Sequence, residues 1–300
     1  MEKKVIFILF ALIFLSGCTG QGPQITLNNN VITLERYVVG TLNPYSESST
    51  SIEFELQHNG NLAARNVEVS FFDLAAEQFK ISNLNCFEGT QKDDRTCFFS
   101  EIKPLDTKKV SIVLIVPNVT TKIPLTVSYY VKYDYTGFKQ GNIPIIDPEK
   151  KPNGPKTKYI ESASSVGPVQ VDFGPPIGSI EQKDDQTITE YWADKGKPFS
   201  MTMTFNGIST SIGKPSPIVI PKNQVKLILD RIAIAPKLQC SFDSSGAAKE
   251  DVKVPSILVC NFQPTDVSQD EMTGIVALNF DYTYEFTKSV TFNVQPLENT

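Results

Sequence analysis

Residues 276–286 read Val-Ala-Leu-Asn-Phe-Asp-Tyr-Thr-Tyr-Glu-Phe, with an apolar residue at every second position. Side chains of a β-strand point alternately to the two faces of its sheet, so this stretch predicts a long strand with one buried face. Residues 125–135 repeat the pattern through Leu125, Val127, Tyr129, Val131, Tyr133 and Tyr135. We interpret these aromatic side chains as core. The dipeptides Thr136-Gly137 and Thr287-Lys288 predict turns that end the two strands.

Shorter alternating stretches precede both long ones, and they give the two halves of the chain a similar outline. Ile52, Phe54 and Leu56 lead into Asn59-Gly60, and residues 199–205 alternate in the same way into Asn206-Gly207. A pair of cysteines follows in each half. The 20 prolines and 17 glycines favour many short strands over helices. The sequence predicts an all-β fold of two tandem antiparallel β-sandwich domains, at 24–146 and 166–296, joined by a proline-rich and lysine-rich linker at 147–165.

The N-terminus carries the pattern of an export signal. Lys3 and Lys4 precede an apolar run from Val5 to Leu15, which is shorter than the roughly 20 residues of a spanning helix. The run ends in Leu15-Ser16-Gly17-Cys18, which resembles the lipobox of prokaryotic lipoproteins. The resemblance implies that residues 1–17 are a cleaved signal peptide, that Cys18 is acylated, and that residues 18–23 are a lipidated tether to the membrane. An ordinary signal peptide and an uncleaved signal anchor are the alternatives.

The other four cysteines form two local pairs, Cys86 with Cys97 and Cys240 with Cys260. Neither pair has the C-x-x-C spacing that favours metal or redox chemistry. Outside the cytosol they favour two disulfides, each worth about 3 kcal/mol in the chain-entropy description. Four cysteines allow three connectivities, and the local one keeps each bridge inside one predicted domain.

The overall charge disfavours some classes of partner. Without residues 1–17 the chain has 26 basic and 32 acidic residues, a net charge of −6. Nucleic acid and anionic lipid would both be repelled by that charge. Forty per cent apolar residues are enough to fill a core, so the chain is not a disordered one.

One stretch, Glu55 to Val69, resembles a known module. It contains an Asn59-Gly60-Asn61 turn followed by the strand Ala64-Arg65-Asn66-Val67-Glu68-Val69. This combination resembles the CARDB-type Ig-like modules of archaeal and bacterial surface proteins. The resemblance implies an Ig-like sandwich, an extracytoplasmic location and a role in adhesion or envelope assembly, with no catalytic residues and no cofactor.

Catalytic motifs are missing from the sequence. His58 is the only histidine, which excludes H-E-x-x-H zinc sites, and we expect it to be an exposed turn residue. No G-x-S-x-G elbow, P-loop or dinucleotide fingerprint occurs. The acidic pairs Asp93-Asp94 and Asp184-Asp185 lie in polar surroundings that would not raise a carboxyl pKa, so we interpret them as solvated loop charges. We predict no catalytic residue and no metal site.

Two positions are candidates for other roles. Tyr191-Trp192 holds the only tryptophan, and tyrosine and tryptophan are frequent in binding hot spots, although a place at the edge of the core is the simpler alternative. Asn118-Val119-Thr120 is an N-glycosylation sequon between two predicted strands.

These observations favour a non-catalytic, lipid-anchored cell-surface protein that binds or scaffolds a protein or glycan partner. A solute-binding lipoprotein of a transport system is the alternative, and it would require helices alternating with strands around a cleft. A hydrolase that works through carboxylates is a third possibility without a positive signal.

Overall fold

The computed structural model describes residues 31–74, 78–151, 153–183, 186–207, 214–265 and 268–297. Within these ranges the chain is all-β and its sheets are antiparallel apart from short parallel bridges, which confirms the predicted fold class. The one helix among the described residues is a single 3₁₀ turn at Lys222–Gln224. No described helix has the length and hydropathy to cross a membrane. The helices that a solute-binding lipoprotein would require do not occur in the described part of the chain.

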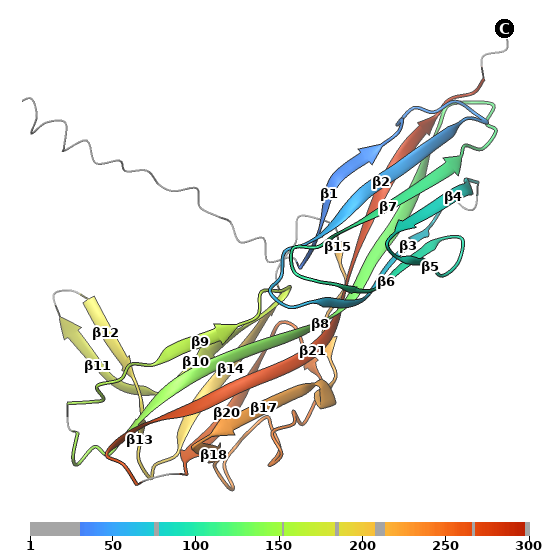
Figure 1. Ribbon diagram of the computed structural model, residues 1–300. Coiled ribbons are helices and arrows are strands. Elements are labelled where there is room, and N and C mark those ends of the chain that lie inside the picture. The colour runs from blue at the N-terminus through green and yellow to red at the C-terminus, as the bar shows by residue number, and fades with distance from the viewer. Residues whose placement is uncertain are drawn as a thin grey trace, which may run out of the picture.

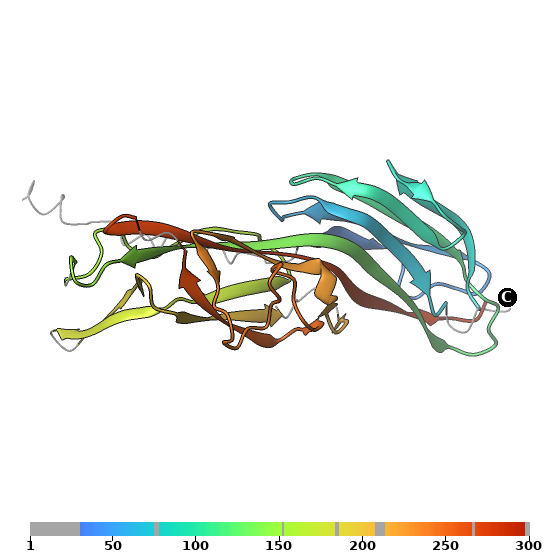
Figure 2. The same cartoon turned by 90° about the horizontal axis from the view of Figure 1, so that it is seen from below.

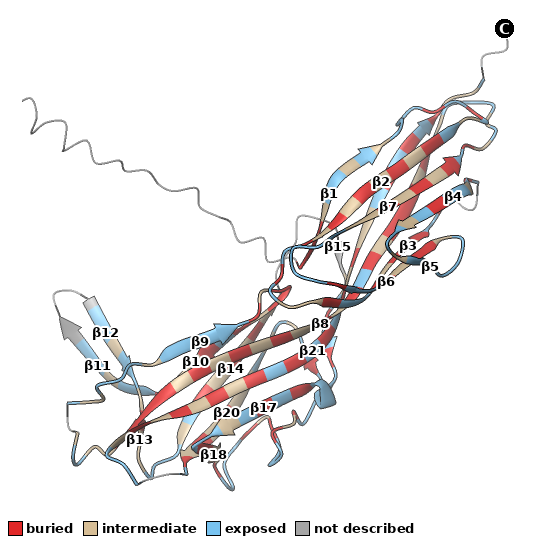
Figure 3. Cartoon of the chain, in the orientation of Figure 1, coloured by how far each residue is buried: buried red, intermediate tan, exposed pale blue. Residues whose placement is uncertain are grey.

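Two strands of 24 residues run through the whole molecule (Figure 1). β8 (Ile123–Ile146) and β21 (Glu271–Val294) pair antiparallel at every position, from Ile123 opposite Val294 to Ile146 opposite Glu271. The two alternating stretches of the sequence are the middle of this ladder. The odd positions of β8 from 125 to 145 are all buried, and so are the even positions of β21 from 272 to 294 except Lys288. One face of the ladder is therefore core along its full length (Figure 3).

The first lobe is a sandwich built at one end of this ladder. Its outer sheet has the order β1 (Ile32–Val39), β2 (Ser49–His58), β7 (Thr107–Ile115), β4 (Lys80–Phe87). In the facing sheet, β3 (Ala64–Phe72) pairs with β8, β6 (Thr96–Ile102) pairs with β3, and β5 (Thr90–Gln91) pairs with β6. The rings of Phe54 on β2 and Tyr129 on β8 stack at 5.0 Å across the core. The Cys86–Cys97 disulfide joins β4 to β6 and so links the two sheets.

The second lobe is a sandwich at the other end of the ladder. Its outer sheet has the order β10 (Val169–Gly174), β14 (Phe199–Gly207), β20 (Ser256–Pro264), β18 (Ile232–Ile234). In the facing sheet, β9 (Ile160–Ser164) pairs with β8, and β17 (Val225–Asp230) pairs with β21. A short strand, β15 (Lys214–Pro215), also pairs with β21, at a position nearer the first lobe. β16 (Val219–Ile220) pairs with β19 (Val252–Lys253) beside it. The rings of Phe205 on β14 and Phe280 on β21 meet at 5.4 Å between the sheets.

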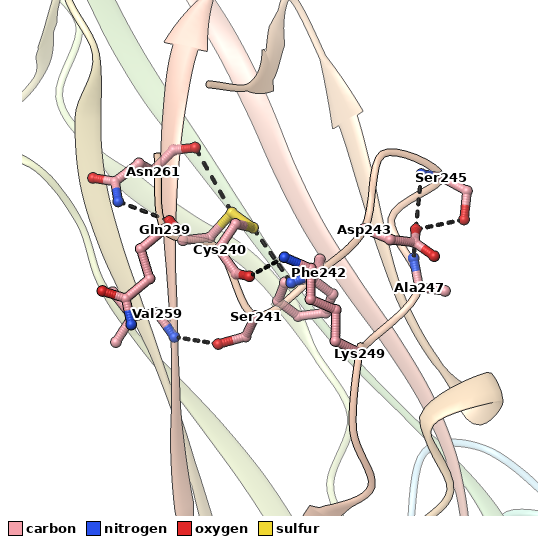
Figure 4. The surroundings of a disulfide bond; sticks show 11 residues. Gln239, Cys240, Ser241, Phe242, Asp243, Ser245, Ala247, Lys249, Val259 and Asn261 are labelled. Carbon is pink, nitrogen blue, oxygen red and sulfur yellow. Dashed lines mark hydrogen bonds between the residues drawn. A yellow bond between two sulfur atoms is a disulfide. The ribbon is translucent and has the colours of Figure 1, made fainter. Parts of the chain in front are cut away.

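The second disulfide, Cys240–Cys260, fastens the loop after β18 to β20 (Figure 4). Hydrogen bonds on both sides of the bridge hold the same loop. The Lys249 Nζ atom donates to the Cys240 carbonyl at 2.9 Å, and the Asn261 Nδ2 atom donates to the Gln239 carbonyl at 2.7 Å. Further along, Asp243 Oδ1 accepts the backbone N–H groups of Ser245 and Ala247, which closes a tight turn.

The two outer sheets lie on opposite sides of the long strands (Figure 2). Both nevertheless cover the same pleated face, because Tyr129 and Phe280 each lie on the buried side of the ladder. The right-handed twist of β-strands accumulates along 24 residues and turns that one face around.

The predicted turns at Thr136-Gly137 and Thr287-Lys288 are wrong, since both dipeptides lie inside paired strands. Gly137 is opposite Phe280, and a Cβ atom at Gly137 would come within 2.2 Å of the Phe280 ring. The glycine thus makes room for an aromatic ring and does not reverse the chain.

The ladder of β8 and β21 joins residues from both predicted domain ranges. Residues 288–294, from the second range, pair with residues 123–129 of the first, and residues 137–146 of the first range belong to the second lobe. The predicted linker at 147–165 contains β9, which pairs with β8. The ranges therefore stay a prediction about folding units, while the hydrogen-bonded ladder crosses their boundary.

The lobes meet at the connection between β2 and β3. This connection passes from one sheet to the other and is not a hairpin, because β2 and β3 belong to different sheets. Asn61 Oδ1 accepts the Val166 N–H at 2.9 Å, and Asn61 Nδ2 donates to the Ser164 carbonyl at 3.2 Å. The Tyr135 hydroxyl donates to the Val166 carbonyl at 2.8 Å and accepts the Leu62 N–H at 3.3 Å. These bonds tie residues of both lobes to one tyrosine and one asparagine.

His58 lies beside this junction and is fully buried, so the expectation of an exposed turn residue is wrong. It is the last residue of β2 and continues the inward face of Ile52, Phe54 and Leu56. Its Nδ1 atom accepts the Gly60 N–H at 3.2 Å. Burial lowers the pKa of His58 below its ordinary value, an effect that nearby backbone hydrogen bonds oppose.

Candidate functional site: an aromatic groove beside β12

A two-stranded hairpin projects from the second lobe (Figure 1). It consists of β11 (Ile177–Lys183) and β12 (Gln186–Tyr191), and it forms a sheet of its own. β12 pairs with β11 along one edge, and no described strand pairs with its other edge. The base of the hairpin is fixed by β13 (Ala193–Asp194), which pairs with the end of β8, and by the Lys195 N–H, which donates to the Ile146 carbonyl at 2.7 Å.

The segment from Pro155 to Tyr159 forms a wall opposite β12, since residues of both line one groove. The carboxylate of Glu271, the first residue of β21, holds the segment in place. Its Oε1 atom accepts the backbone N–H groups of Lys156 at 2.8 Å and Thr157 at 2.9 Å, and the Thr157 hydroxyl at 3.0 Å. Its Oε2 atom accepts a bond from Lys151 Nζ at 3.1 Å. These bonds to Thr157, Lys151 and Lys156 lower the pKa of Glu271 to about 2.

Trp192 lies at the base of the hairpin, packed against two glycines. A Cβ atom at Gly178 would come within 1.9 Å of the Trp192 Cδ2 atom, and one at Gly154 within 3.2 Å of Cζ3. No residue with a side chain would fit at Gly178 without displacing the indole. The hairpin backbone therefore covers part of the indole ring system and fixes its position.

Tyr159 and Tyr191 bring a second aromatic contact to the same place. Their ring centroids are 6.0 Å apart and their planes differ by 65°. A Cβ atom at Gly141 of β8 would lie 3.0 Å from the Tyr159 hydroxyl, so the absence of a side chain there makes room for this tyrosine. The hydroxyl lies 3.5 Å from Glu161, which forms an ion pair with the nearly buried Lys139. Burial, followed by the nearby Glu161 charge, raises the pKa of Tyr159.

Between the free edge of β12 and this wall lies an open groove of about 210 Å³. It is lined by residues 155, 157–159 and 188–192. Its rim carries one ammonium group, on Lys158, and one carboxylate, on Glu190. Within the described residues neither forms an ion pair, and Glu190 accepts one hydrogen bond, from Ser179 Oγ at 3.4 Å. Of the apolar side chains that line the groove, Ile188 and Tyr191 are exposed.

The structure thus brings the two predicted interaction residues, Tyr191 and Trp192, together in one groove. The opposite wall was not predicted, because Thr157 and Tyr159 lie in the predicted linker. The sequence Lys158-Tyr159-Ile160-Glu161 was the available signal, since it places two large apolar residues in an otherwise polar segment.

The other predicted residues lie elsewhere. Cys18 and the pair Asp184-Asp185 lie outside the described residues. Asn118 is exposed between β7 and β8 of the first lobe, where its Nδ2 atom donates to Glu47 Oε1 at 3.0 Å. Asp93 accepts the Arg95 N–H at 2.8 Å, and this bond lowers its pKa, which is opposite to what a catalytic acid requires. The described residues contain no cluster of three or more potential metal ligands.

Comparison with known proteins gives no family. No family model matches the sequence, and no curated protein matches it. Among solved structures, the chain is similar to domains D2 and D3 of the major pilin SpaD from Corynebacterium diphtheriae, at 9% identity and a TM-score of 0.24, over 60% of this chain and 84% of that one. It is also similar to the serine-rich repeat protein Srr2 from Streptococcus agalactiae, at 10% identity and a TM-score of 0.19, over 87% of this chain and 93% of that one. The collagen adhesin CNA from S. aureus is similar at 8% identity and a TM-score of 0.16, over 89% of this chain and 93% of that one. No residue of these proteins is carried over to this chain.

Proposed function

We propose that this chain is a non-catalytic, lipid-anchored protein of the cell surface that binds an extracytoplasmic partner through the groove beside β12. The observation that carries the proposal is the groove itself. It exposes aromatic and apolar side chains next to an unpaired strand edge, at the base of a projecting hairpin. Exposed apolar surface of this kind is a feature of interaction sites.

Two further observations support the location. Both lobes contain a disulfide, and disulfides persist in oxidising compartments outside the cytosol. The Leu15-Ser16-Gly17-Cys18 sequence supplies an acylation site ahead of the first strand. Two or more acyl chains, at about 0.8 kcal/mol for each buried methylene group, would hold the protein at a membrane.

The location is tested with the full chain and its Cys18→Ser variant in a prokaryotic host that acylates lipoproteins. We expect the wild type in the membrane fraction, with residues 1–17 removed and an acyl mass on Cys18, and accessible to protease on cells whose cell wall has been removed. The variant should lose the acyl mass and leave the membrane fraction. A wild-type protein found in the cytosol with free thiols would contradict the proposal.

The same mass spectra test the modification predicted at Asn118. An added glycan mass on the peptide that contains Asn118 is expected in a host that glycosylates exported sequons, and an Asn118→Gln variant serves as its control.

A further inference from the structure

We propose that the groove receives an extended polypeptide segment, which adds to the free edge of β12 as a third strand of the hairpin sheet. The inference deepens the proposed function and rests on it, because it names the chemical class of the partner. It is carried by the backbone of β12, the size of the groove, the orientation of its aromatic rings and the charges on its rim.

The backbone of β12 supplies the main attraction. Along its outer edge the N–H and C=O groups have no described strand as a partner, and no backbone hydrogen bond outside the β11 pairing involves residues 187–192. Such an edge is a template for another extended chain, which satisfies these groups in alternation. The partner must therefore carry regularly spaced donors and acceptors, as a polypeptide backbone does.

The size of the groove fits side chains of such a segment. Pockets that enclose small-molecule ligands have volumes of roughly 300–1,000 Å³. This groove, at about 210 Å³, is smaller and open along one side. It has room for one or two apolar side chains, while the rest of the bound segment follows β12 out of the groove.

The aromatic rings are not arranged as a stacking platform for a sugar. The hairpin backbone at Gly178 presses on the Trp192 indole. Tyr159 and Tyr191 are inclined to each other by 65°, so they do not present parallel faces. A groove lined by a covered indole and two inclined rings suits an inserted aliphatic or aromatic side chain better than a flat pyranose.

The two charges on the rim define the flanks of the segment. Glu190 and Lys158 have opposite signs and no ion-pair partner among the described residues. A segment with an apolar central residue between a basic and an acidic residue would complement both charges.

The test uses the emission of Trp192, the only tryptophan of the chain, as a direct reporter of the groove. An array of heptapeptides with an apolar centre between Lys and Glu, in either order, is screened against the full chain. Hits are then titrated while the emission of Trp192 is followed. We expect saturable shifts, together with slower hydrogen exchange of the amides of residues 187–191.

Strand addition is separated from other peptide binding by backbone methylation of the best heptapeptide. N-methyl groups at alternate residues should weaken binding at least 10-fold, and those at the intervening residues should have little effect, because only every second N–H faces β12. Binding that is insensitive to every N-methyl group would overturn the proposal.

Three variants of the full chain locate the site. Tyr191→Ala should weaken binding at least 10-fold, and Tyr191→Phe should retain it. The matched control is Ile257→Ala, which removes an exposed apolar side chain from β20 of the same lobe. Tyr191 is itself exposed, so loss of folding is not expected, and thermal unfolding of each variant checks this. Equal weakening by Tyr191→Ala and Ile257→Ala would count against the groove.

One result would separate this inference from the proposed function. In it, oligosaccharides shift the Trp192 emission and none of the heptapeptides does. That outcome would overturn the peptide proposal and leave a surface-binding protein. A cytosolic location of the chain would overturn the proposed function whatever the groove binds.

Discussion

Tyr135 connects the two lobes through its hydroxyl group, and the tyrosine two positions earlier gives a natural comparison. The Tyr135 hydroxyl bonds to the backbone of Val166 and Leu62. The Tyr133 hydroxyl is buried and forms no hydrogen bond of normal geometry with the described residues, although the backbone of Ile32 lies near it. Both side chains lie on the same buried face of β8, so the hydroxyl groups differ in their bonds more than in their burial.

Tyr135→Phe should therefore lower the free energy of unfolding by about 0.5–1.5 kcal/mol, because the half-buried Val166 carbonyl and Leu62 N–H lose this partner. Tyr133→Phe should be neutral or stabilising, since it removes a buried polar atom that has no hydrogen bond of normal geometry. Urea unfolding of the two variants and the wild type measures the difference. Equal effects would mean that the bonds at the junction contribute nothing to stability.

His58 makes stability depend on pH in a definite direction. Its pKa in the folded protein is lowered, mainly by burial, from an ordinary value of 6.5. The unfolded chain therefore binds the proton more readily, and stability decreases as the pH falls below about 6.5 towards the folded pKa. We expect the urea midpoint to fall between pH 7 and pH 5 in the wild type and to change less in His58→Gln. A wild-type midpoint that is constant over this range would contradict the prediction.

For single residues, the sequence predicted the burial of side chains well and the role of glycines poorly. The alternation placed Tyr129, Tyr133 and Tyr135 in the core, and all three are buried. It could not distinguish a turn glycine from one that faces a ring. Gly137 accommodates Phe280, which lies 143 positions later, and no local pattern encodes such a distant neighbour.

Among the elements, the β11–β12 hairpin depends on close packing between Gly178 and Trp192. We expect Gly178→Ala to displace the indole, shift its emission and expose it to acrylamide quenching, with little change in the thermal unfolding of the lobes. Gly207→Ala is the control, because its added methyl group would approach only Val254 at 3.2 Å. An unchanged Trp192 emission in Gly178→Ala would contradict the packing described for the groove.

The Cys86–Cys97 disulfide joins two elements in different sheets at the edge of the first lobe. The double variant Cys86→Ser, Cys97→Ser should lose about 3 kcal/mol of stability, because the unfolded chain is no longer constrained. Urea unfolding under non-reducing conditions measures this loss. Reduction of the wild type should also weaken the first lobe, whereas the double variant should respond to reduction only through Cys240–Cys260.

The elements that the sequence could not predict are those that depend on distant partners. β9 lies in a segment with few apolar residues, and its strand conformation follows from pairing with β8. The groove has a similar origin, since its wall is held by Glu271, more than 100 residues away in the sequence. Sequence patterns identified Tyr191 and Trp192 as candidates, but only the fold brings Tyr159 to them.

On the scale of the whole molecule, the first lobe is completed by the end of the chain. Residues 288–294 of β21 pair with residues 123–129 of β8, and Phe292 is buried in the core of that lobe. The range 24–146 therefore lacks one of the strands that cover the core of the first lobe. The strand pairs that close the first lobe join residues 159 to 171 positions apart, and such distant pairing is slow to form.

A fragment of residues 24–146 should accordingly show no cooperative unfolding transition. The same fragment should recover one when residues 285–297 are added through a glycine-serine linker long enough to run back along the ladder from Ile146 to the partner of Lys132. Circular dichroism and urea titration of both fragments provide the comparison. Cooperative unfolding of the shorter fragment would instead support 24–146 as an independent folding unit.

The continuous ladder also determines how the molecule responds to a pulling force. A force that draws the two lobes apart acts along the long axis, which is the direction of β8 and β21 (Figure 1). Two polypeptide backbones cross from one lobe to the other, so this tension falls on peptide bonds and not on an interface of side chains. Val31 lies at the junction of the lobes, where its carbonyl accepts the Asn59 N–H at 2.7 Å. A force applied through the chain ahead of Val31 and through a partner in the groove would therefore load the second lobe and leave the first lobe out of its path.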